Sequence, residues 1–209
     1  MSGRASASAS ATAALAAQIC AQIGAVFFSP PPPGFPPPLG VLVSEISAAA
    51  SAGRRVFVHG VGREGLMMKA LCMRLAHLGL PAHVVGDVTA PPAATGDLLL
   101  ASAGPGGFST VDAICGVAKA SGARVVLITA QPAAGSGARR SADAVAYVPT
   151  RTMADDEAEE EGKDAAVRLP MGSLYEGALY VLFEMAVMRL AEELKQSPAQ
   201  MRSRHTNLE

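Results

Sequence analysis

The sequence contains few aromatic residues and few charges. Of its 209 residues, 4% are aromatic and 17% are charged, Trp is absent, and 50% are hydrophobic. A surface that stacks the bases of single-stranded nucleic acid needs aromatic side chains, so the composition argues against one. The formal net charge of −1 predicts neither nucleic acid nor an anionic membrane as a partner.

Long apolar runs and paired cysteines are also missing. No stretch reaches the roughly 18 apolar residues of a membrane span, which predicts no membrane partner. The three cysteines, Cys20, Cys72 and Cys115, are widely spaced and odd in number, which predicts buried free thiols in a reducing compartment. We therefore expect a cytoplasmic protein, although the acid-free, Ser- and Ala-rich start over 1–10 also resembles an organelle-targeting peptide. No spacing of His, Cys or carboxylates suggests a metal site, and no cofactor is expected.

Short apolar runs alternate with helical patterns along most of the chain. The runs predict strands over 55–59, 82–85, 97–102, 124–129 and 144–148. The helical patterns cover 11–28, 39–51, 63–78, 108–120 and 172–194. Near-continuous apolar strands are typical of a parallel sheet covered on both faces. The sequence thus predicts one doubly wound α/β domain over 11–209, with extra helices at both ends and a disordered stretch over 1–10.

Two segments have a biased composition. Residues 29–38 are rich in proline, which predicts a surface loop joining two helices rather than a Pro-rich recognition ligand. Residues 154–164 hold seven of the 18 acidic residues but one of the 17 basic ones. We expect this second segment to be a solvated acidic loop.

Two glycine-bearing loops lead from a predicted strand into a predicted helix. The first, HGVGREG over 59–65, has the spacing G-x-G-x-x-G, and the second is SAGPGG over 102–107. The first pattern is found where a dinucleotide binds, and Asp87 would then hold the ribose. However, Glu64 would lie close to the pyrophosphate, and a nicotinamide site does not need the second loop. Together, the loops better predict a site that presents backbone N–H groups to an anion.

Longer motifs resemble the sugar isomerase (SIS) domain, and within it the 6-phospho-3-hexuloisomerase family. Residues 60–87 resemble the first half of the domain, and MRLAHLG over 73–79 matches the helix end of the family. LPMGSLYE over 169–176 and RHTNLE over 204–209 resemble two later motifs. The resemblance runs from about residue 39 to the end. It implies a Rossmann-like fold, conversion between a 3-hexulose 6-phosphate and fructose 6-phosphate through a cis-enediol, and a homo-oligomer (tetramer or dimer).

The same resemblance implies the site residues. Glu176 matches the catalytic base and His205 a second acid–base group. The expected sugar-phosphate-binding residues come from the two loops: Gly62, Arg63, Glu64, Ser102, Gly104, Gly106, Ser109 and Thr110. Apart from the motif, Glu176 would be an ordinary first-turn acid that favours the helix dipole. His205 lies in a polar tail, which reaches a site only by docking on a folded surface such as a neighbouring subunit.

The phosphate-binding hydroxyls of the family are altered here. Glu64 stands at the Ser of the first loop, and Ala103, Pro105 and Phe108 stand at the three hydroxyl positions of the second. Two unit charges about 4 Å apart repel by roughly 4 kcal/mol at an effective dielectric near 20, so Glu64 disfavours a phosphate. Three hypotheses remain. The chain is an isomerase with a rebuilt phosphate loop, a non-catalytic protein that binds or senses a carbohydrate derivative, or an oligomeric scaffold without a ligand.

Overall fold

The computed structural model describes residues 2–28, 30–155 and 169–207, with side chains from residue 10 onward. The predicted acidic loop over 154–164 lies outside the described residues from 156 on. The centre of the molecule is a parallel sheet in the order β2-β1-β3-β4-β5. Its strands are β1 (Val56–His59), β2 (Ala82–Val84), β3 (Leu98–Ser102), β4 (Arg124–Thr129) and β5 (Ala144–Tyr147). The predicted strands and their parallel arrangement are confirmed.

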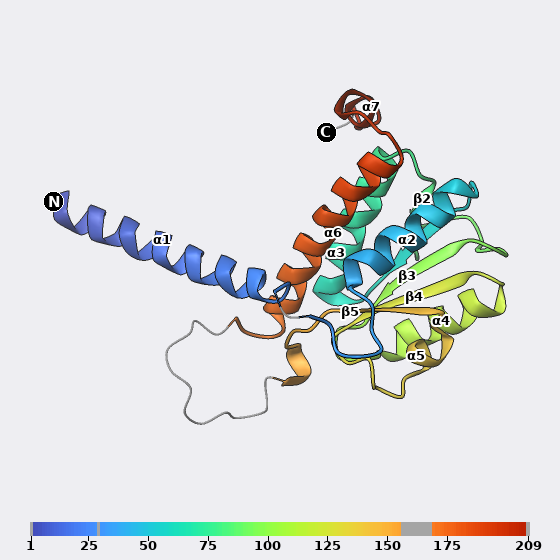
Figure 1. Cartoon of the computed structure of the whole chain (residues 1–209), viewed down its shortest axis with the longest axis horizontal. Coiled ribbons are helices and arrows are strands. Elements are labelled where there is room, and N and C mark those ends of the chain that lie inside the picture. Colours follow the sequence, from blue (N-terminus) through green and yellow to red (C-terminus); the bar gives the residue numbers. More distant parts are fainter. Residues whose placement is uncertain (1, 29, 156–168, 208–209) are drawn as a thin grey trace.

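Helices cover both faces of this sheet (Figure 1). One face is covered by α2 (Pro38–Ser51), α3 (Gly62–His77) and α6 (Ser173–Glu193), the other by α4 (Ser109–Ala120) and α5 (Gly137–Ser141). Strand side chains alternate between these layers. Val56 and Val58 pack in the core under α2, α3 and α6, while Phe57 packs in the core under α4 and α5. The central strands β1, β3 and β4 are buried on both faces, which explains why they are mostly apolar. The doubly wound fold is confirmed.

The ends of the chain differ most from the expectation. Helix α1 spans Ser2–Ala25, so it includes residues 2–10, for which we expected disorder, and it ends before residue 28. Figure 1 shows α1 extending away from the body, with its last turns beside α6. The Ala- and Ser-rich composition explains the helix, because Ala has the highest helix propensity.

Two short helices were missing from the sequence-based prediction. The polar tail contains α7 (Pro198–Ser203), which begins with a capping box between Ser197 and Gln200. Helix α5 is too short to show a helical period, although Ser136 caps it by accepting from the N–H of Arg139. A single turn of 3-10 helix, η1 (Met153–Asp155), follows β5. Residues 30–37 connect α1 to α2 without a helix or strand, and Pro38 opens α2.

Burial corrects one expectation about the cysteines. Cys72 and Cys115 are buried free thiols, as expected, whereas Cys20 is exposed on α1. Burial raises the pKa of the Cys72 thiol to about 11 and that of Cys115 to about 12, because a thiolate is poorly solvated in an apolar core. Among the described residues, no helix has both the length and the apolar character needed to cross a membrane.

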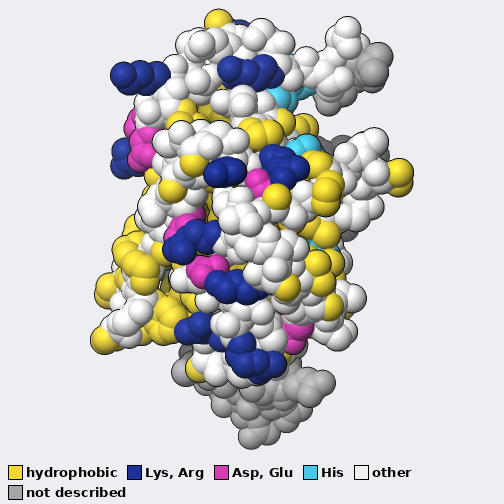
Figure 2. Space-filling model, turned by 90° about the vertical axis from the view of Figure 1, so that its right-hand side faces the viewer, with side chains coloured by type: hydrophobic (Ala, Val, Ile, Leu, Met, Phe, Trp, Pro, Cys, Tyr) yellow, Lys and Arg dark blue, Asp and Glu magenta, His cyan; other side chains and the backbone are white. Residues whose placement is uncertain are grey.

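Charges of both signs are interspersed on one side of the molecule. Figure 2 shows the side that lies at the right of Figure 1, where basic and acidic side chains lie next to one another along the middle. Two ion pairs of the described chain are Arg55 with the buried Asp97, at 2.7 Å, and Arg124 with Glu45, at 2.5 Å. This side therefore lacks a continuous patch of positive charge, which is the kind of surface that binds nucleic acid. The absence of a nucleic-acid partner stays a prediction.

The topology defines where a ligand is expected to bind. Strands β1 and β3 are neighbours, but the chain leaves β1 toward β2 and leaves β3 toward β4, in opposite directions along the sheet. In open α/β sheets, ligands bind at this switch point, outside the carboxyl ends of the strands. The loops over 60–61 and 103–108, which lead into α3 and α4, both start there.

A close backbone contact holds α3 against the end of β1. A Cβ added to Gly65 would lie 2.6 Å from the carbonyl oxygen of Gly60, a backbone atom that cannot rotate away. We therefore expect Gly65→Ala to lower the free energy of unfolding by about 1–3 kcal/mol, the cost of overpacking. Gly116→Ala is the control, because an added Cβ meets nothing within 4 Å in α4. It should stabilise the protein by about 0.4–1 kcal/mol. Urea denaturation measures both, and equal effects would contradict the contact.

Candidate functional site

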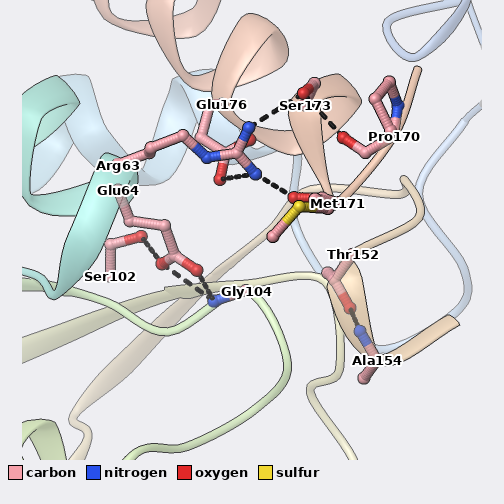
Figure 3. Close-up of polar contacts among 10 residues, drawn as sticks. All are labelled: Arg63, Glu64, Ser102, Gly104, Thr152, Ala154, Pro170, Met171, Ser173 and Glu176. Atoms are coloured by element: carbon pink, nitrogen blue, oxygen red, sulfur yellow. Dashed lines mark hydrogen bonds and ion pairs between the residues drawn. The ribbon is translucent and has the colours of Figure 1, made fainter. Parts of the chain in front are cut away.

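Glu64 lies in the first turn of α3 and is buried, with 6% of its surface exposed. Its carboxylate accepts a hydrogen bond from Ser102 Oγ at 2.7 Å and from the N–H of Gly104 at 3.0 and 3.1 Å to its two oxygens (Figure 3). We call these two donors, Ser102 Oγ–H and Gly104 N–H, the anion seat. The seat lies at the carboxyl end of β3, and the carboxylate that fills it comes from the first turn of α3.

A buried hydroxyl chain continues from the seat into the core. Ser102 Oγ lies 3.2 Å from the hydroxyl of Tyr175, which donates to the carbonyl of Ile128 at 3.0 Å. Tyr175 is fully buried, and burial raises its pKa well above the usual value, so the phenol is neutral. A role for Tyr175 was not predicted, although this residue directly precedes Glu176 in LPMGSLYE.

Arg63 connects the start of α3 to the start of α6. Its guanidinium donates to Ser173 Oγ at 2.9 Å and to the carbonyl of Met171, and it lies 3.3 Å from a carboxylate oxygen of Glu176 (Figure 3). Met171 and Gly172 both have left-handed backbone conformations, with φ of 53° and 74°. Such a conformation is unfavourable for Met, and Arg63 holds the turn by binding its carbonyl. The roles of Ser173 and Met171 were also not predicted.

Glu176 is the candidate base. Its side chain is 16% exposed, and one carboxylate oxygen, Oε2, is buried without a hydrogen-bond partner among the described residues. Burial raises the pKa of Glu176, and Arg63 partly offsets this shift. Burial also raises the pKa of Glu64, with Ser102 and Gly104 lowering it and the charge of Glu176 raising it further. The site thus holds two carboxylates and one guanidinium, and one carboxylate has an oxygen available to take a proton.

Two helices begin beside this group without a side-chain cap. Val61 before α3 and Gly172 before α6 make no capping hydrogen bond through a side chain. The first N–H groups of a helix have no partner within it, and the helix dipole adds partial positive charge there. These helix starts therefore favour negative charge in the site, both the carboxylates of the protein and an anionic ligand.

Part of the predicted site lies elsewhere. Gly106 packs against the loop after β4, where an added Cβ would lie 2.3 Å from Ala134. Ser109 and Thr110 are exposed in the first turn of α4. Among the described residues, no hydrogen bond joins them to the group formed by Arg63, Glu64 and Glu176. Of the hydroxyls expected to rebuild the phosphate loop, Ser102 joins this group. Gly62 begins α3 with a left-handed φ of 56°.

His205 lies far from Glu176 within one chain. Its ring stacks on that of His77 at 5.3 Å, and the preceding Arg204 donates to the carbonyl of His77 at 2.8 Å. His77 ends α3, whereas Arg63 and Glu64 begin it. At 1.5 Å per residue, the 16 residues of α3 separate the two ends by about 22 Å. The two predicted acid–base groups therefore do not meet in one chain.

The part of the chain that the structure describes contains no cluster of three or more His, Cys, Asp or Glu suited to a metal ion. His59 ends β1, and its Nε2 is buried without a hydrogen-bond partner among the described residues. Burial lowers the pKa of His59, which keeps the ring neutral. The expectation that neither a metal nor another cofactor is needed stays a prediction.

Comparisons with known proteins place the chain among its relatives. No protein-family model matches the chain. It is 38% identical over 155 residues to 3-hexulose-6-phosphate isomerase of Mycobacterium gastri, covering 74% of each chain. It is 31% identical over 158 residues to the enzyme of the same name from Bacillus subtilis, covering 76% of this chain and 82% of the relative.

Solved structures share the fold. A protein from Methanococcus jannaschii, whose crystal structure infers a function of 3-hexulose-6-phosphate isomerase, superposes with a TM-score of 0.66 at 23% identity. The match covers 82% of this chain and 86% of that one. At this identity the likeness shows the fold alone, and the sequence relatives carry the family assignment. The chain belongs to the 3-hexulose-6-phosphate isomerase family and has the fold of the sugar isomerase domain.

Proposed function

We propose that this protein is a sugar-phosphate isomerase that interconverts a 3-hexulose 6-phosphate and fructose 6-phosphate. The observation that carries the proposal is the buried, unpartnered oxygen of Glu176 at the switch point of the sheet. Relatives at 38% and 31% identity bear the name of this activity. The uncapped starts of α3 and α6 support an anionic substrate.

The proposed reaction moves a carbonyl by one carbon. The Glu176 carboxylate removes the hydrogen from C3 of fructose 6-phosphate, and the electron pair of that bond forms the C2=C3 bond of a cis-enediol as O2 gains a proton. The proton on Glu176 exchanges with solvent, and Glu176 then delivers a proton to C2 while O3 loses one, which leaves the carbonyl at C3. A positioned base within hydrogen-bond reach is what such a proton transfer requires. Arg63 holds Glu176 in place and favours its charged form.

The test is to approach the equilibrium from both sides. Fructose 6-phosphate and a 3-hexulose 6-phosphate are incubated separately with the protein, and NMR follows both ketoses. We expect the same final mixture from either starting sugar. Two unchanged samples over hours at high protein concentration would refute the isomerase function.

We also propose that the protein is a homo-oligomer. Helices α3 and α6 expose large apolar side chains, namely Leu66, Met73, Tyr180 and Met188, with exposed fractions between 48% and 66%. Helix α1 stands away from the body, and Leu15 on it is 45% exposed. Apolar side chains on a helix normally face another element, and a second copy of the chain would cover these. The second copy would also bring its own tail, so we propose that His205 acts in the site of a neighbouring subunit.

Subunit mixing tests the role of His205. Glu176→Gln and His205→Ala chains should each be inactive alone. When the two are unfolded and refolded together, about one quarter of the sites should combine Glu176 of one chain with His205 of another, if they mix at random. Activity near a quarter of the wild-type value is therefore expected. A mixture as inactive as its components would contradict a shared site.

A second candidate function is binding without turnover. It is favoured by one observation: Glu64 fills the anion seat, where a phosphate would otherwise find its donors. In this case fructose 6-phosphate would bind saturably, Glu176→Gln would leave its affinity unchanged, and neither starting sugar would be converted.

A further inference from the structure

The anion seat has two donors, and both already donate to the Glu64 carboxylate. Within the loop after β3, the N–H of Ala103 donates to the carbonyl of Ile128 at 3.0 Å, and the N–H of Gly106 donates to the carbonyl of Ala103 at 2.9 Å. Pro105 has no N–H. Gly104 N–H, together with Ser102 Oγ–H, is directed at a negative charge, and that charge is the Glu64 carboxylate.

We propose that Glu64 is an internal anion that occupies the phosphate position of the free protein and thereby sets its affinity for sugar phosphates. This inference rests on the proposed function, because it assumes that the substrate carries a phosphate. A phosphate and the Glu64 carboxylate need the same two donors, and donors of this kind form their strongest hydrogen bonds with charged acceptors. Binding of the dianion therefore requires that Glu64 lose its charge or leave the seat.

The surrounding charges support this competition. Glu64 is faced by Arg63 on its own helix and by Tyr175 and Glu176 from α6, while the loop after β3 contributes the uncharged groups of Ser102 and Gly104. Arg63 is shared with Glu176, Ser173 and Met171. A phosphate dianion would thus enter a site that already holds two carboxylates against one guanidinium. Two like charges at close range repel strongly in a partly buried site.

When Glu64 gains a proton, the hydroxyls of Ser102 and Tyr175 can still form hydrogen bonds without any of the oxygen atoms moving. In the ionised state, Ser102 donates to Glu64 and Tyr175 donates to the carbonyl of Ile128, so the 3.2 Å contact between the two hydroxyls contains no hydrogen of its own. With a proton on Glu64, the carboxyl donates to Ser102, Ser102 to Tyr175 and Tyr175 to Ile128. Each contact then contains one hydrogen. Burial of Glu64 also raises its pKa and thus favours the protonated form.

Calorimetry with inorganic phosphate and with fructose 6-phosphate tests the inference. The proteins are wild type, Glu64→Gln, which keeps the shape of the side chain, and Glu64→Ser, which empties the seat. Glu192→Gln removes an equal charge from an exposed position of α6 and is the control. At about pH 8, both Glu64 variants should bind either ligand about tenfold more tightly or better, because the ionised carboxylate is gone. The control should bind like the wild type.

The pH dependence gives a second readout. The ratio of the wild-type Kd to the Glu64→Gln Kd should be largest at about pH 8 and fall toward one as the pH is lowered through the raised pKa of Glu64, because the carboxylate is then protonated. Taking the ratio cancels the ionisation of the phosphate itself, which has a second pKa of about 6. Equal or weaker binding by both variants, or a ratio that does not change with pH, would overturn the inference.

The outcome is separable from that of the proposed function. Tighter phosphate binding by both Glu64 variants, without isomerisation by any protein, would keep the role of Glu64 and reject the isomerase. Isomerisation by the wild type, with variants that bind no more tightly, would keep the isomerase and reject the role of Glu64. Thermal melts of each variant check that the fold is intact.

Discussion

Glu176→Gln is expected to lower kcat for the isomerisation by about 10²- to 10⁴-fold, the range that a positioned general base contributes. The amide keeps the size of the side chain and can still accept from Arg63, but it cannot take the hydrogen from C3. The affinity for fructose 6-phosphate should be kept or become tighter, since the loss of a group that acts in the transition state lowers kcat rather than binding, and the variant also removes a negative charge from the site. Initial rates and calorimetry measure the two quantities.

The pH profile of the wild type should show the same group. Glu176 must be ionised to act as a base, so activity should fall as the pH drops through its pKa. Burial raises this pKa from the ordinary value of 4.5, so the acid limb should lie above that value. Glu184→Gln is the matched control, because Glu184 lies further along α6, where it pairs with Arg74 at 3.1 Å. Its kcat should equal that of the wild type. A Glu176→Gln protein with normal kcat would remove Glu176 from the mechanism.

Tyr175→Ala is expected to lower the free energy of unfolding by about 3–5 kcal/mol, the usual cost of removing a buried aromatic ring. Tyr175 is 2% exposed and packs in the core between the sheet and α6. Its removal leaves a cavity directly behind the anion seat, because Ser102 lies 3.2 Å from its hydroxyl.

Tyr175→Phe is the comparison that separates the ring from the hydroxyl. The carbonyl of Ile128 still accepts from the N–H of Ala103, so the loss of the hydroxyl should cost about 1 kcal/mol, the worth of one hydrogen bond. Chemical denaturation of both variants, read from the midpoint and slope, gives the two values. A Phe variant as unstable as the Ala variant would mean that the hydroxyl chain, rather than packing, holds Tyr175.

Most of the fold was readable from hydrophobic periodicity. The runs RVFV, DLLLAS and RVVLIT contain uninterrupted apolar stretches with polar residues only at their ends, which predicted a sheet buried on both faces. The predicted ends of α2, α3, α4 and α6 agree with the structure within one residue. Short elements such as α5 contain too few turns to show a period. The tail contains a helix-start pattern, Ser197-Pro198 with Gln200 three residues after the cap. We nevertheless predicted no helix there, because the tail is polar.

The candidate site was predictable in its location but not in its contacts. The two glycine loops follow β1 and β3, and parallel neighbours bring their ends together, so Arg63, Glu64, Ser102 and Gly104 meet. Whether the Glu64 carboxylate faces the seat depends on the register, in which His59 of β1 pairs with Ala101 of β3. The alternation of side chains between the two faces of a strand does not specify that register.

The remaining gaps have a physical reason as well. Tyr175 and Ser173 lie in a motif next to Glu176, yet a buried Tyr in an apolar helix looks like any core aromatic until its hydroxyl partners are known. The position of His205 relative to a second site depends on how copies of the chain associate, which a pattern within one chain does not encode.

The most direct measurement is hydrogen exchange at C3 of fructose 6-phosphate in D₂O, followed by NMR with and without the protein. The account predicts that the C3 proton signal decays at a rate proportional to protein concentration, that a 3-hexulose 6-phosphate with deuterium at C2 appears, and that Glu176→Gln abolishes both. If fructose 6-phosphate binds but its C3 hydrogen is retained and no 3-hexulose 6-phosphate appears over hours at high protein concentration, Glu176 is not acting as a base on this sugar, and the isomerase proposal is contradicted.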